Sequence, residues 1–470
     1  MKKRYISILS ALAILVSPPV AWSAQVATVM SAQPESETDD EEEIDGEETV
    51  TDDEDDRAVR ENPVIIPDEA DDIDIPIPSF IRKGANHIIY NGSDWSDLRK
   101  AFVGSSNRPV SIIHIGDSHI QADISSGTTR ELLQYDFGNA GRGLIAPLKM
   151  SGTNQPVDYL FQSKNAWNPV KLMSASWRQT VGFTGTSIHP VSNSGEITVG
   201  TTERDDYNPF SSVTIFHNGK MTIENVTDSN GNKINFRAIP SRDYTQIVMA
   251  STETKVSIQF KSTGDLTIFG ASLSGSPRGV FYHAIGNNGA TYDTYNRIGT
   301  VGQGISPLNP DLVIISLGTN EAFGRLDVSG FTRAIDRLVK NIRASNPDAQ
   351  ILLTTPMECQ KSVYSTKKTR VKTKRRRGKK SRYRTVSKKV KSYAVNNNIA
   401  PLRQAILDYG KNNSIAVYDW YEVAGGRGAS STWISHNLFA GDRVHHTHKG
   451  YNLEGRLVYD AIMDALRDNK

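Results

Sequence analysis

The chain is 470 residues long, contains a single cysteine, Cys359, and carries a formal net charge of +2 at pH 7. A chain of this length can bury the cores of two or more domains, and one cysteine excludes internal disulfide bonds. These features exclude a small secreted domain stapled by disulfides.

The first 23 residues have the pattern of a secretory signal peptide. A basic start at residues 1–4 is followed by an apolar run at 5–20 and a cleavage-like segment at 21–23. The apolar run is too short to span a bilayer as a helix, and no second long apolar run follows. We therefore expect an exported protein, periplasmic, secreted or at the cell envelope, with no transmembrane segment in its mature form.

Two opposed charge blocks underlie the small net charge. Residues 35–74 hold 21 Asp or Glu and two Arg, whereas residues 367–391 hold 15 Lys or Arg and no acid. The acidic block has too little apolar surface to fold, which predicts a disordered acidic tether over residues 24–79. The basic block predicts a solvated loop over residues 361–393 that could bind anionic polymers. We expect no nucleic-acid site, because this loop interrupts another domain and holds few stacking aromatics.

An α/β pattern begins after the tether. Residues 110–115 are mostly apolar and β-branched, which predicts a buried parallel strand, and Gly116 then allows a sharp turn. Ser118 follows at once, and a capping box of Thr128 and Glu131 predicts the start of a helix. A serine at the carboxyl end of a buried strand lies where open α/β sheets bind ligands, although an ordinary turn is the alternative.

The pattern changes between residues 150 and 277. Short alternating runs recur between turn residues such as His217-Asn218-Gly219, and helical periodicity disappears. Many short strands at even spacing predict an antiparallel β-sandwich. We expect this sandwich to be inserted between two halves of an α/β domain, at residues 80–149 and 278–470.

Strands and helices alternate again in the second half of the α/β domain. Buried strands are predicted over residues 279–285 and 311–317, and polar segments with Gly289 and Asn320 follow them. An amphipathic helix is expected over residues 331–344. Strands that alternate with helices predict a parallel sheet covered by helices on both faces, which is a three-layer α/β/α fold.

These segments supply the groups that serine catalysis needs. Asp442 and His445 are three residues apart, so one helical turn would place both on one face. The carboxylate could hold the imidazole Nδ1–H while Nε2 faces Ser118, whose hydroxyl needs such a base. The backbone N–H groups of Ser118 and Gly289 and the amide of Asn320 could bind a developing oxyanion.

Several polar residues have alternative roles. Asn320 alone could cap a helix. The neighbouring histidines suggest a metal site, yet no His-Glu-x-x-His spacing accompanies them, so we expect no metal and no organic cofactor. His446 and His448 are expected at the surface, and His436 is a weaker base candidate because no Asp lies at the right spacing. Asp117 is expected to fix its loop by hydrogen bonding.

Four segments together resemble the blocks that define the SGNH (GDSL-type) hydrolases. They are Gly116-Asp117-Ser118, Gly289, Gly318-Thr319-Asn320-Glu321 and Asp442-Arg443-Val444-His445. The resemblance covers residues 80–148 and 278–470 and implies a flavodoxin-like sheet. The inserted sandwich is further similar to that of bacterial peptidoglycan O-acetylesterases, whose insert is similar to a carbohydrate-binding module. Two features depart from the family pattern: His119 stands where Leu or Ile commonly follows the serine, and the basic tract is additional.

The resemblance implies an exported serine esterase that removes O-acetyl groups from a cell-envelope glycan, with peptidoglycan the first candidate. Ser118 would be the nucleophile, His445 the base and Asp442 its partner, with Ser118, Gly289 and Asn320 as the oxyanion hole. Two alternatives stay open. One is an O-acetyltransferase that passes the acetyl group to a sugar hydroxyl, and the other is a relict glycan-binding protein. Since all four catalytic positions are filled, the sequence argues against the relict.

Overall fold

The structure is a computed structural model that describes residues 75–202, 208–372 and 383–467. The expected signal peptide and the acidic segment up to residue 74 lie outside the described residues. Ile75 and Ile77 already pack against the main apolar core, so the predicted tether ends before residue 79. In the described ranges, no helix combines the length and apolar character needed to cross a membrane.

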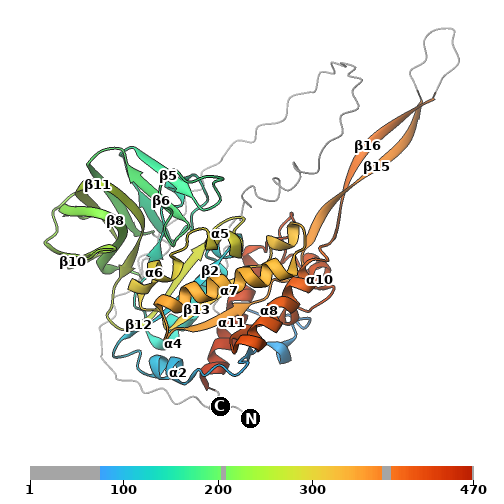
Figure 1. Cartoon of the computed structure of the whole chain (residues 1–470), viewed down its shortest axis with the longest axis horizontal. Coiled ribbons are helices and arrows are strands. Elements are labelled where there is room, and N and C mark those ends of the chain that lie inside the picture. Colours follow the sequence, from blue (N-terminus) through green and yellow to red (C-terminus); the bar gives the residue numbers. More distant parts are fainter. Residues whose placement is uncertain (1–74, 203–207, 373–382, 468–470) are drawn as a thin grey trace, which may run out of the picture. The chain divides into compact units, whose positions relative to one another are not determined.

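A six-stranded sheet with the order β1-β17-β14-β13-β2-β12 forms the centre of the α/β part (Figure 1). Its strands are β1 (Ile88–Ile89), β2 (Pro109–Gly116), β12 (Gly279–Gly286), β13 (Leu312–Ser316), β14 (Gln350–Thr354) and β17 (Ala416–Tyr418). Five strands pair in parallel, and only β1 is antiparallel to its neighbour β17. The parallel strands follow the 2-1-3-4-5 order of flavodoxin-like sheets, as predicted, and β1 makes the sheet mixed.

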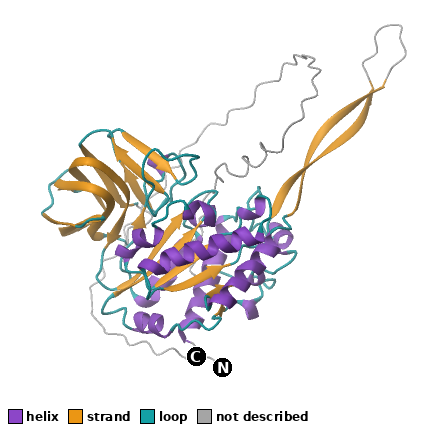
Figure 2. Cartoon of the chain, in the orientation of Figure 1, coloured by secondary structure: helices purple, strands orange, loops and turns teal. Residues whose placement is uncertain are grey.

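Helices pack in two groups beside this sheet (Figure 2). One group is α2 (Ser96–Val103), α4 (Ser125–Phe137) and α11 (His448–Arg467); the other is α5 (Tyr292–Asn296), α6 (Val301–Ile305), α7 (Val328–Ser345) and α8 (Ile399–Asn413). Short helices α3 (Ser118–Gln121), α9 (Trp420–Val423) and α10 (Ala429–Ser435) lie in the connections. α7 confirms the amphipathic prediction, because its stripe of Ile335, Leu338, Val339 and Ile342 is buried.

A second, antiparallel sheet of nine strands occupies much of the region between β2 and β12 (Figure 1). Its strands are β3 (Gly143–Ile145), β4 (Tyr159–Gln162), β5 (Trp167–Lys171), β6 (Thr186–Pro190), β7 (Ser194–Thr201), β8 (Phe210–Thr227), β9 (Phe236–Pro240), β10 (Tyr244–Glu253) and β11 (Lys255–Ser274). It encloses an apolar core of its own. The antiparallel prediction is therefore confirmed, but the strands form one hydrogen-bonded sheet rather than two.

The long strands β8 and β11 explain this difference from a sandwich. Their pairing shifts register at several points, and such irregularities let a strand bend while it stays hydrogen bonded. His217-Asn218-Gly219, predicted as a turn, lies inside β8 at one of these shifts, where Gly219 has φ 77°. One curved sheet thus encloses a core that two sheets were expected to share.

The two sheets are joined more closely than the predicted boundaries suggest. β3 pairs with β11, so the antiparallel sheet begins at Gly143 rather than at residue 150. Leu172, Phe183 and Phe216 from the antiparallel part belong to the apolar core of the central sheet. That residues 150–277 form a separate inserted domain stays a prediction.

A buried ionic network connects the segment after α3 to the antiparallel sheet. Arg130 donates to both carboxylate oxygens of Asp123 at 3.1 and 3.2 Å, and Arg142 donates to the same carboxylate. Both arginines also pair with Asp158, just before β4. Burial raises the pKa of Asp123, but the two guanidinium groups outweigh burial and hold that pKa below its ordinary value.

The described parts of the basic tract form two paired strands, called the hairpin below, so the prediction of a loop is wrong for residues 361–372 and 383–393; residues 373–382 lie outside the described residues. β15 (Gln360–Lys372) and β16 (Tyr383–Val395) pair antiparallel in a separate two-stranded sheet (Figure 1). Val, Thr and Tyr recur among the basic residues of this tract, and these residue types favour β-strands. Most of the described side chains of the hairpin are exposed.

Arg142→Met is expected to lower the free energy of unfolding by about 3–5 kcal/mol, because it leaves the buried carboxylate of Asp123 with one cation fewer. Arg142 is 1% exposed. Urea unfolding followed by tryptophan fluorescence measures the change. Arg108→Met is the matched control, because Arg108 pairs with Asp311 from a half-exposed position, where a loss of about 1 kcal/mol or less is expected. Equal losses in the two variants would contradict the role of the network.

Candidate active site

Ser118 lies at the carboxyl end of β2, at the first position of α3. The neighbouring strand β12 ends at Gly286, where a Cβ would come within 2.0 Å of the backbone nitrogen of Gln121. Glycine at the end of β12 therefore lets α3 pack directly over that strand end. Asp117 caps α3, because its Oδ1 accepts the backbone N–H of His119 at 2.9 Å. This confirms that Asp117 fixes the loop by hydrogen bonding.

The capping-box prediction for the next helix is wrong. α4 begins at Ser125, and Thr128 lies inside it with its hydroxyl donating to the carbonyl of Ile124. α3 and α4 follow one another across Asp123, which has φ 53° and belongs to the ionic network. The serine is therefore held on a short helix between a glycine-rich strand end and a buried ion cluster.

The structure brings Ser118, His445 and Asp442 together. The Ser118 hydroxyl oxygen lies 2.7 Å from His445 Nε2, and His445 Nδ1 lies 2.5 Å from Asp442 Oδ2. Ser118 and His445 are 8% and 3% exposed. A hydroxyl, an imidazole and a carboxylate thus form a continuous hydrogen-bonded line, in which proton transfer from the serine to the imidazole needs no large movement.

A tight turn, rather than the predicted helical turn, places Asp442 beside His445. Arg443 has φ 61°, and Asp442 Oδ1 accepts the backbone N–H groups of Val444 and His445, both at 3.0 Å. An aspartate that bonds its own following backbone stabilises such a turn. Burial raises the pKa of Asp442, but the hydrogen bond from His445 and these backbone N–H groups outweigh burial, so the pKa lies below its ordinary value.

The base of the hairpin holds the same turn. The guanidinium of Arg443 lies 4.0 Å from the ring centroid of Tyr393 and donates to Gln360 Oε1 at 2.9 Å. The backbone N–H of Gln360 donates to the Arg443 carbonyl at 3.0 Å, and the Tyr393 hydroxyl donates to the Gly441 carbonyl at 3.3 Å. Both hairpin strands therefore contact residues that flank Asp442.

Within the described ranges, His119, His446, His448 and His436 do not form the hydrogen bonds to Ser118 and Asp442 that His445 forms. The ring of His119 lies 5.1 Å from that of His445, and burial beside two other histidines lowers the pKa of His119 well below its ordinary value. The surface prediction for His446 is wrong: this side chain is 1% exposed and packs among aromatic rings. His448 is half-buried at the start of α11. His436 is exposed, and its Nδ1 contacts the carbonyl oxygen of Thr432.

Gly289 and Asn320 follow β12 and β13. The backbone N–H groups of Ser118 and Gly289 donate to no other residue in the described part of the chain. The Asn320 amide nitrogen donates to Asp117 Oδ2 and to the Ala290 carbonyl, both at 3.1 Å. Asn320 thus connects the segment of the serine to the segment of Gly289, and both of its amide hydrogens have partners.

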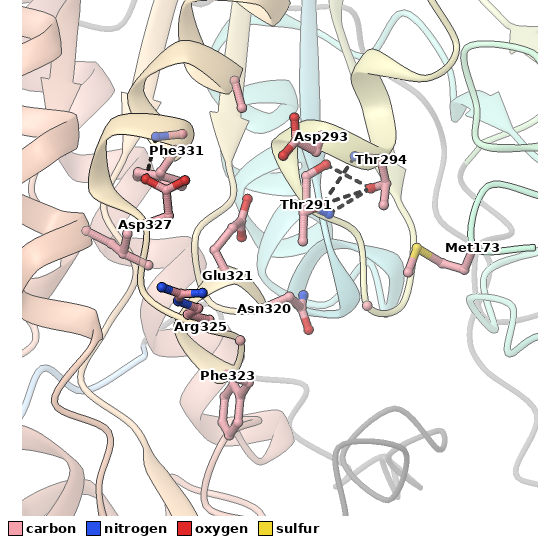
Figure 3. Close-up of a pocket in the computed structure, with 15 residues that line it drawn as sticks. Met173, Thr291, Asp293, Thr294, Asn320, Glu321, Phe323, Arg325, Asp327 and Phe331 are labelled. Carbon is pink, nitrogen blue, oxygen red and sulfur yellow. Dashed lines mark hydrogen bonds between the residues drawn. The ribbon is translucent and has the colours of Figure 1, made fainter. Parts of the chain in front are cut away.

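A cavity of about 450 Å³ opens beside Gly289 and Asn320 (Figure 3). Besides these two it is lined by Met173, Thr291, Asp293, Thr294, Glu321, Phe323, Gly324, Arg325, Asp327, Gly330, Phe331, Ala334 and Leu402. Met173 follows β5 of the antiparallel sheet, and Arg297 holds this segment by donating to the carbonyls of Leu172 and Ser174. Sequence reasoning missed Met173 and Arg325, because no motif links the two loops that carry them.

Two buried acids beside the site have raised pKa values. Burial raises the pKa of Glu321 to about 8 and that of Asp117 to about 7. Glu321 Oε1 accepts the backbone N–H of Tyr292 at 2.8 Å, whereas its Oε2 has no partner among the described residues. Burial thus favours the protonated form of the Glu321 carboxyl group. The described ranges contain no group of three or more His, Cys, Asp or Glu placed to bind a metal.

Comparison with known proteins identifies the enzyme class. Residues 262–453 match the model of the GDSL-like lipase/acylhydrolase family, a range that includes Gly289, Asn320, Asp442 and His445 but not Ser118. The chain thus carries a GDSL-type acyl hydrolase region, and three of the four predicted blocks lie within the matched range. No curated protein matches the chain.

Among solved structures, one described as a peptidoglycan O-acetylesterase in action has a TM-score of 0.61 at 20% identity, covering 81% of this chain and 99% of that one. It shows that the two chains share a fold. A lipase/acylhydrolase from Enterococcus faecalis matches at 17% identity with a TM-score of 0.27, covering 40% of this chain and 78% of that one. A carbohydrate esterase family 3 enzyme from Talaromyces cellulolyticus matches at 15% identity with a TM-score of 0.27, covering 42% of this chain and 77% of that one.

Glu321→Gln is expected to flatten the pH dependence of folding stability between about pH 4.5 and 8. The folded chain keeps the Glu321 proton up to a pKa of about 8, whereas the unfolded chain releases it near the ordinary 4.5. The free energy of unfolding of the natural chain therefore falls as pH rises through this window. Glutamine has no such proton, and its oxygen can still accept the Tyr292 N–H.

Thermal unfolding across this pH range provides the measurement. Asp97→Asn serves as the control, because it removes a carboxylate whose side chain is 82% exposed. The Glu321 account fails if Glu321→Gln and the natural chain lose stability with the same slope.

Proposed function

We propose that this GDSL-type acyl hydrolase removes O-acetyl groups from a cell-envelope glycan, with peptidoglycan as its substrate. The observation that carries the proposal is the hydrogen-bonded line of Ser118, His445 and Asp442. The solved structure described as a peptidoglycan O-acetylesterase, which matches most of the chain, supports this substrate class. Under this proposal the expected signal peptide exports the enzyme to its glycan.

The proposed reaction begins with attack of the Ser118 hydroxyl oxygen on the acetyl carbonyl carbon. His445 Nε2, 2.7 Å away, takes the hydroxyl proton, and Asp442 stabilises the imidazolium that forms. The tetrahedral intermediate then expels the sugar oxygen, which leaves with the proton from His445. Water activated by the same imidazole hydrolyses the acetyl-enzyme and releases acetate.

The negative charge of the intermediate needs donors fixed in advance. The unpaired backbone N–H groups of Ser118 and Gly289 are two such donors at neighbouring strand ends. Asn320 is the third, and its amide exchanges the Ala290 carbonyl for the oxyanion when substrate binds. Asp117 keeps the other amide hydrogen and so holds the side chain in place during this exchange.

The hairpin is proposed to bind anionic polymers of the envelope. Lys367 lies directly opposite Lys388 in the β15–β16 register, and like charges at such positions repel. A two-stranded sheet is only marginally stable in water, so a bound polyanion that neutralises these charges would stabilise it. The antiparallel nine-stranded sheet is proposed to hold glycan rather than to perform chemistry.

Ser118→Ala is expected to abolish acetate release from O-acetylated peptidoglycan and to leave the melting temperature within about 2 °C of the natural chain, because it deletes one hydroxyl. Acetate is measured enzymatically, with acetylated xylan as a comparison substrate. In the same assay Asn320→Ala is expected to lower kcat on the order of 10²–10³-fold, as for one oxyanion donor. Natural activity in Ser118→Ala would overturn the assignment of the nucleophile.

Replacing the exposed cations of the hairpin by glutamine is expected to weaken binding to polygalacturonate at least about tenfold at low salt, and to change little at high salt. The replaced residues are Lys367, Lys368, Arg370, Lys388, Lys389 and Lys391. The control replaces six exposed cations of the α/β part: Lys83, Lys100, Arg333, Lys340, Arg343 and Lys411. Equal weakening in both sets would show that binding depends on net charge and not on the hairpin.

A further inference from the structure

We infer that the cavity beside Gly289 and Asn320 binds the sugar that carries the acetyl group, and that Arg325 binds a carboxylate of that sugar. This inference rests on the proposed function and names its substrate class as an acidic glycan.

The position of the cavity supports a role in substrate binding. Its wall includes Gly289 and Asn320, two of the three proposed oxyanion donors, so a group held in it lies next to the reacting ester. A volume of about 450 Å³ falls within the range of small-ligand sites and accommodates a substituted sugar ring. Met173 and Phe323 add apolar wall for the C–H face of a ring.

Arg325 is the only cation among the residues that line the cavity, beside the acids Asp293, Glu321 and Asp327. Asp293 lies 3.8 Å from the guanidinium of Arg337, and Asp327 Oδ1 accepts the Gly330 N–H at the start of α7. Burial favours the neutral form of the Glu321 carboxyl group, whose pKa is raised to about 8. Arg325, by contrast, has no hydrogen-bond or ion-pair partner among the residues that the structure describes.

The chemistry of arginine identifies the group it would bind. Its planar guanidinium presents paired N–H groups that match the two oxygens of a carboxylate, and such charge-assisted pairs are stronger than neutral hydrogen bonds. Figure 3 shows Arg325 on the same loop as Asn320 and Glu321, along one wall of the cavity. Peptidoglycan suits this arrangement, because the lactyl carboxyl group of its acetylated muramyl sugar is a free carboxylate where no peptide is attached, and its peptides carry further carboxylates.

A pair of matched substrates tests the assignment. O-acetylated N-acetylmuramic acid has a free carboxylate, and its methyl ester has the same acetyl group without the charge. We expect Arg325→Ala to raise KM for the acid about 10-fold or more and to leave KM for the methyl ester and hydrolysis of 4-nitrophenyl acetate within about twofold. Arg325→Lys should recover part of the loss. Arg333→Ala, an exposed arginine on α7 outside the cavity lining, should change neither substrate.

A second measurement keeps the inference separate from the proposed function. N-acetylmuramic acid, which has no acetyl ester to lose, is expected to inhibit 4-nitrophenyl acetate hydrolysis by the natural chain, and at least about 10-fold less strongly by Arg325→Ala. Inhibition that is equal in the two proteins overturns the role of Arg325, whatever glycan the enzyme deacetylates. Loss of that inhibition together with no acetate release from O-acetylated peptidoglycan would instead reject the proposed substrate and support the acidic-sugar site.

Discussion

The carboxylate of Asp123 is ionised in the protein interior, where it is stable only because Arg130 and Arg142 contact it. The members of this network come from different parts of the chain. Arg130 lies in α4 and Arg142 in the glycine-rich segment before β3. Asp158, which pairs with both arginines, lies just before β4. All of these segments must be folded before the ionised side chains of Asp123, Arg130 and Arg142 can be buried. The short helix with Ser118, which ends just before Asp123, is therefore fixed by both sheets.

The proposed catalytic groups depend on the same kind of distant support. The turn of Asp442 and His445 is closed by its own backbone hydrogen bonds and is also held from outside by Gln360 and Tyr393 of the hairpin. Asn396, just after β16, donates its side-chain amide to the carbonyl of Ala322, next to the segment of Asn320. The hairpin and the residue that follows it therefore contact both of the segments that complete the site.

Much of this arrangement could be predicted because it follows from local patterns. Buried apolar runs gave the parallel strands, and the residues at the strand ends gave the site, since parallel strands place their carboxyl ends at one edge. The predictions were wrong where contacts between residues far apart in the sequence determine the local conformation or the burial of a side chain. Arg443 adopts a positive φ although it is not glycine, His446 is buried because aromatic rings enclose it, and β8 continues through a segment that reads as a turn. Met173 and Arg325 meet at one cavity only in the folded chain.

The pairing of β3 with β11 has a consequence for how this protein could have arisen and how it can be recombined. A segment exchanged at residues 150 and 277 would leave β3 behind as an unpaired edge and would remove Leu172, Phe183 and Phe216 from the core of the central sheet. Exchange between related enzymes is thus constrained to pieces that begin before Gly143 and bring a matching apolar surface. Recombination of the antiparallel part with another hydrolase therefore has to preserve the β3–β11 pairing and these core contacts.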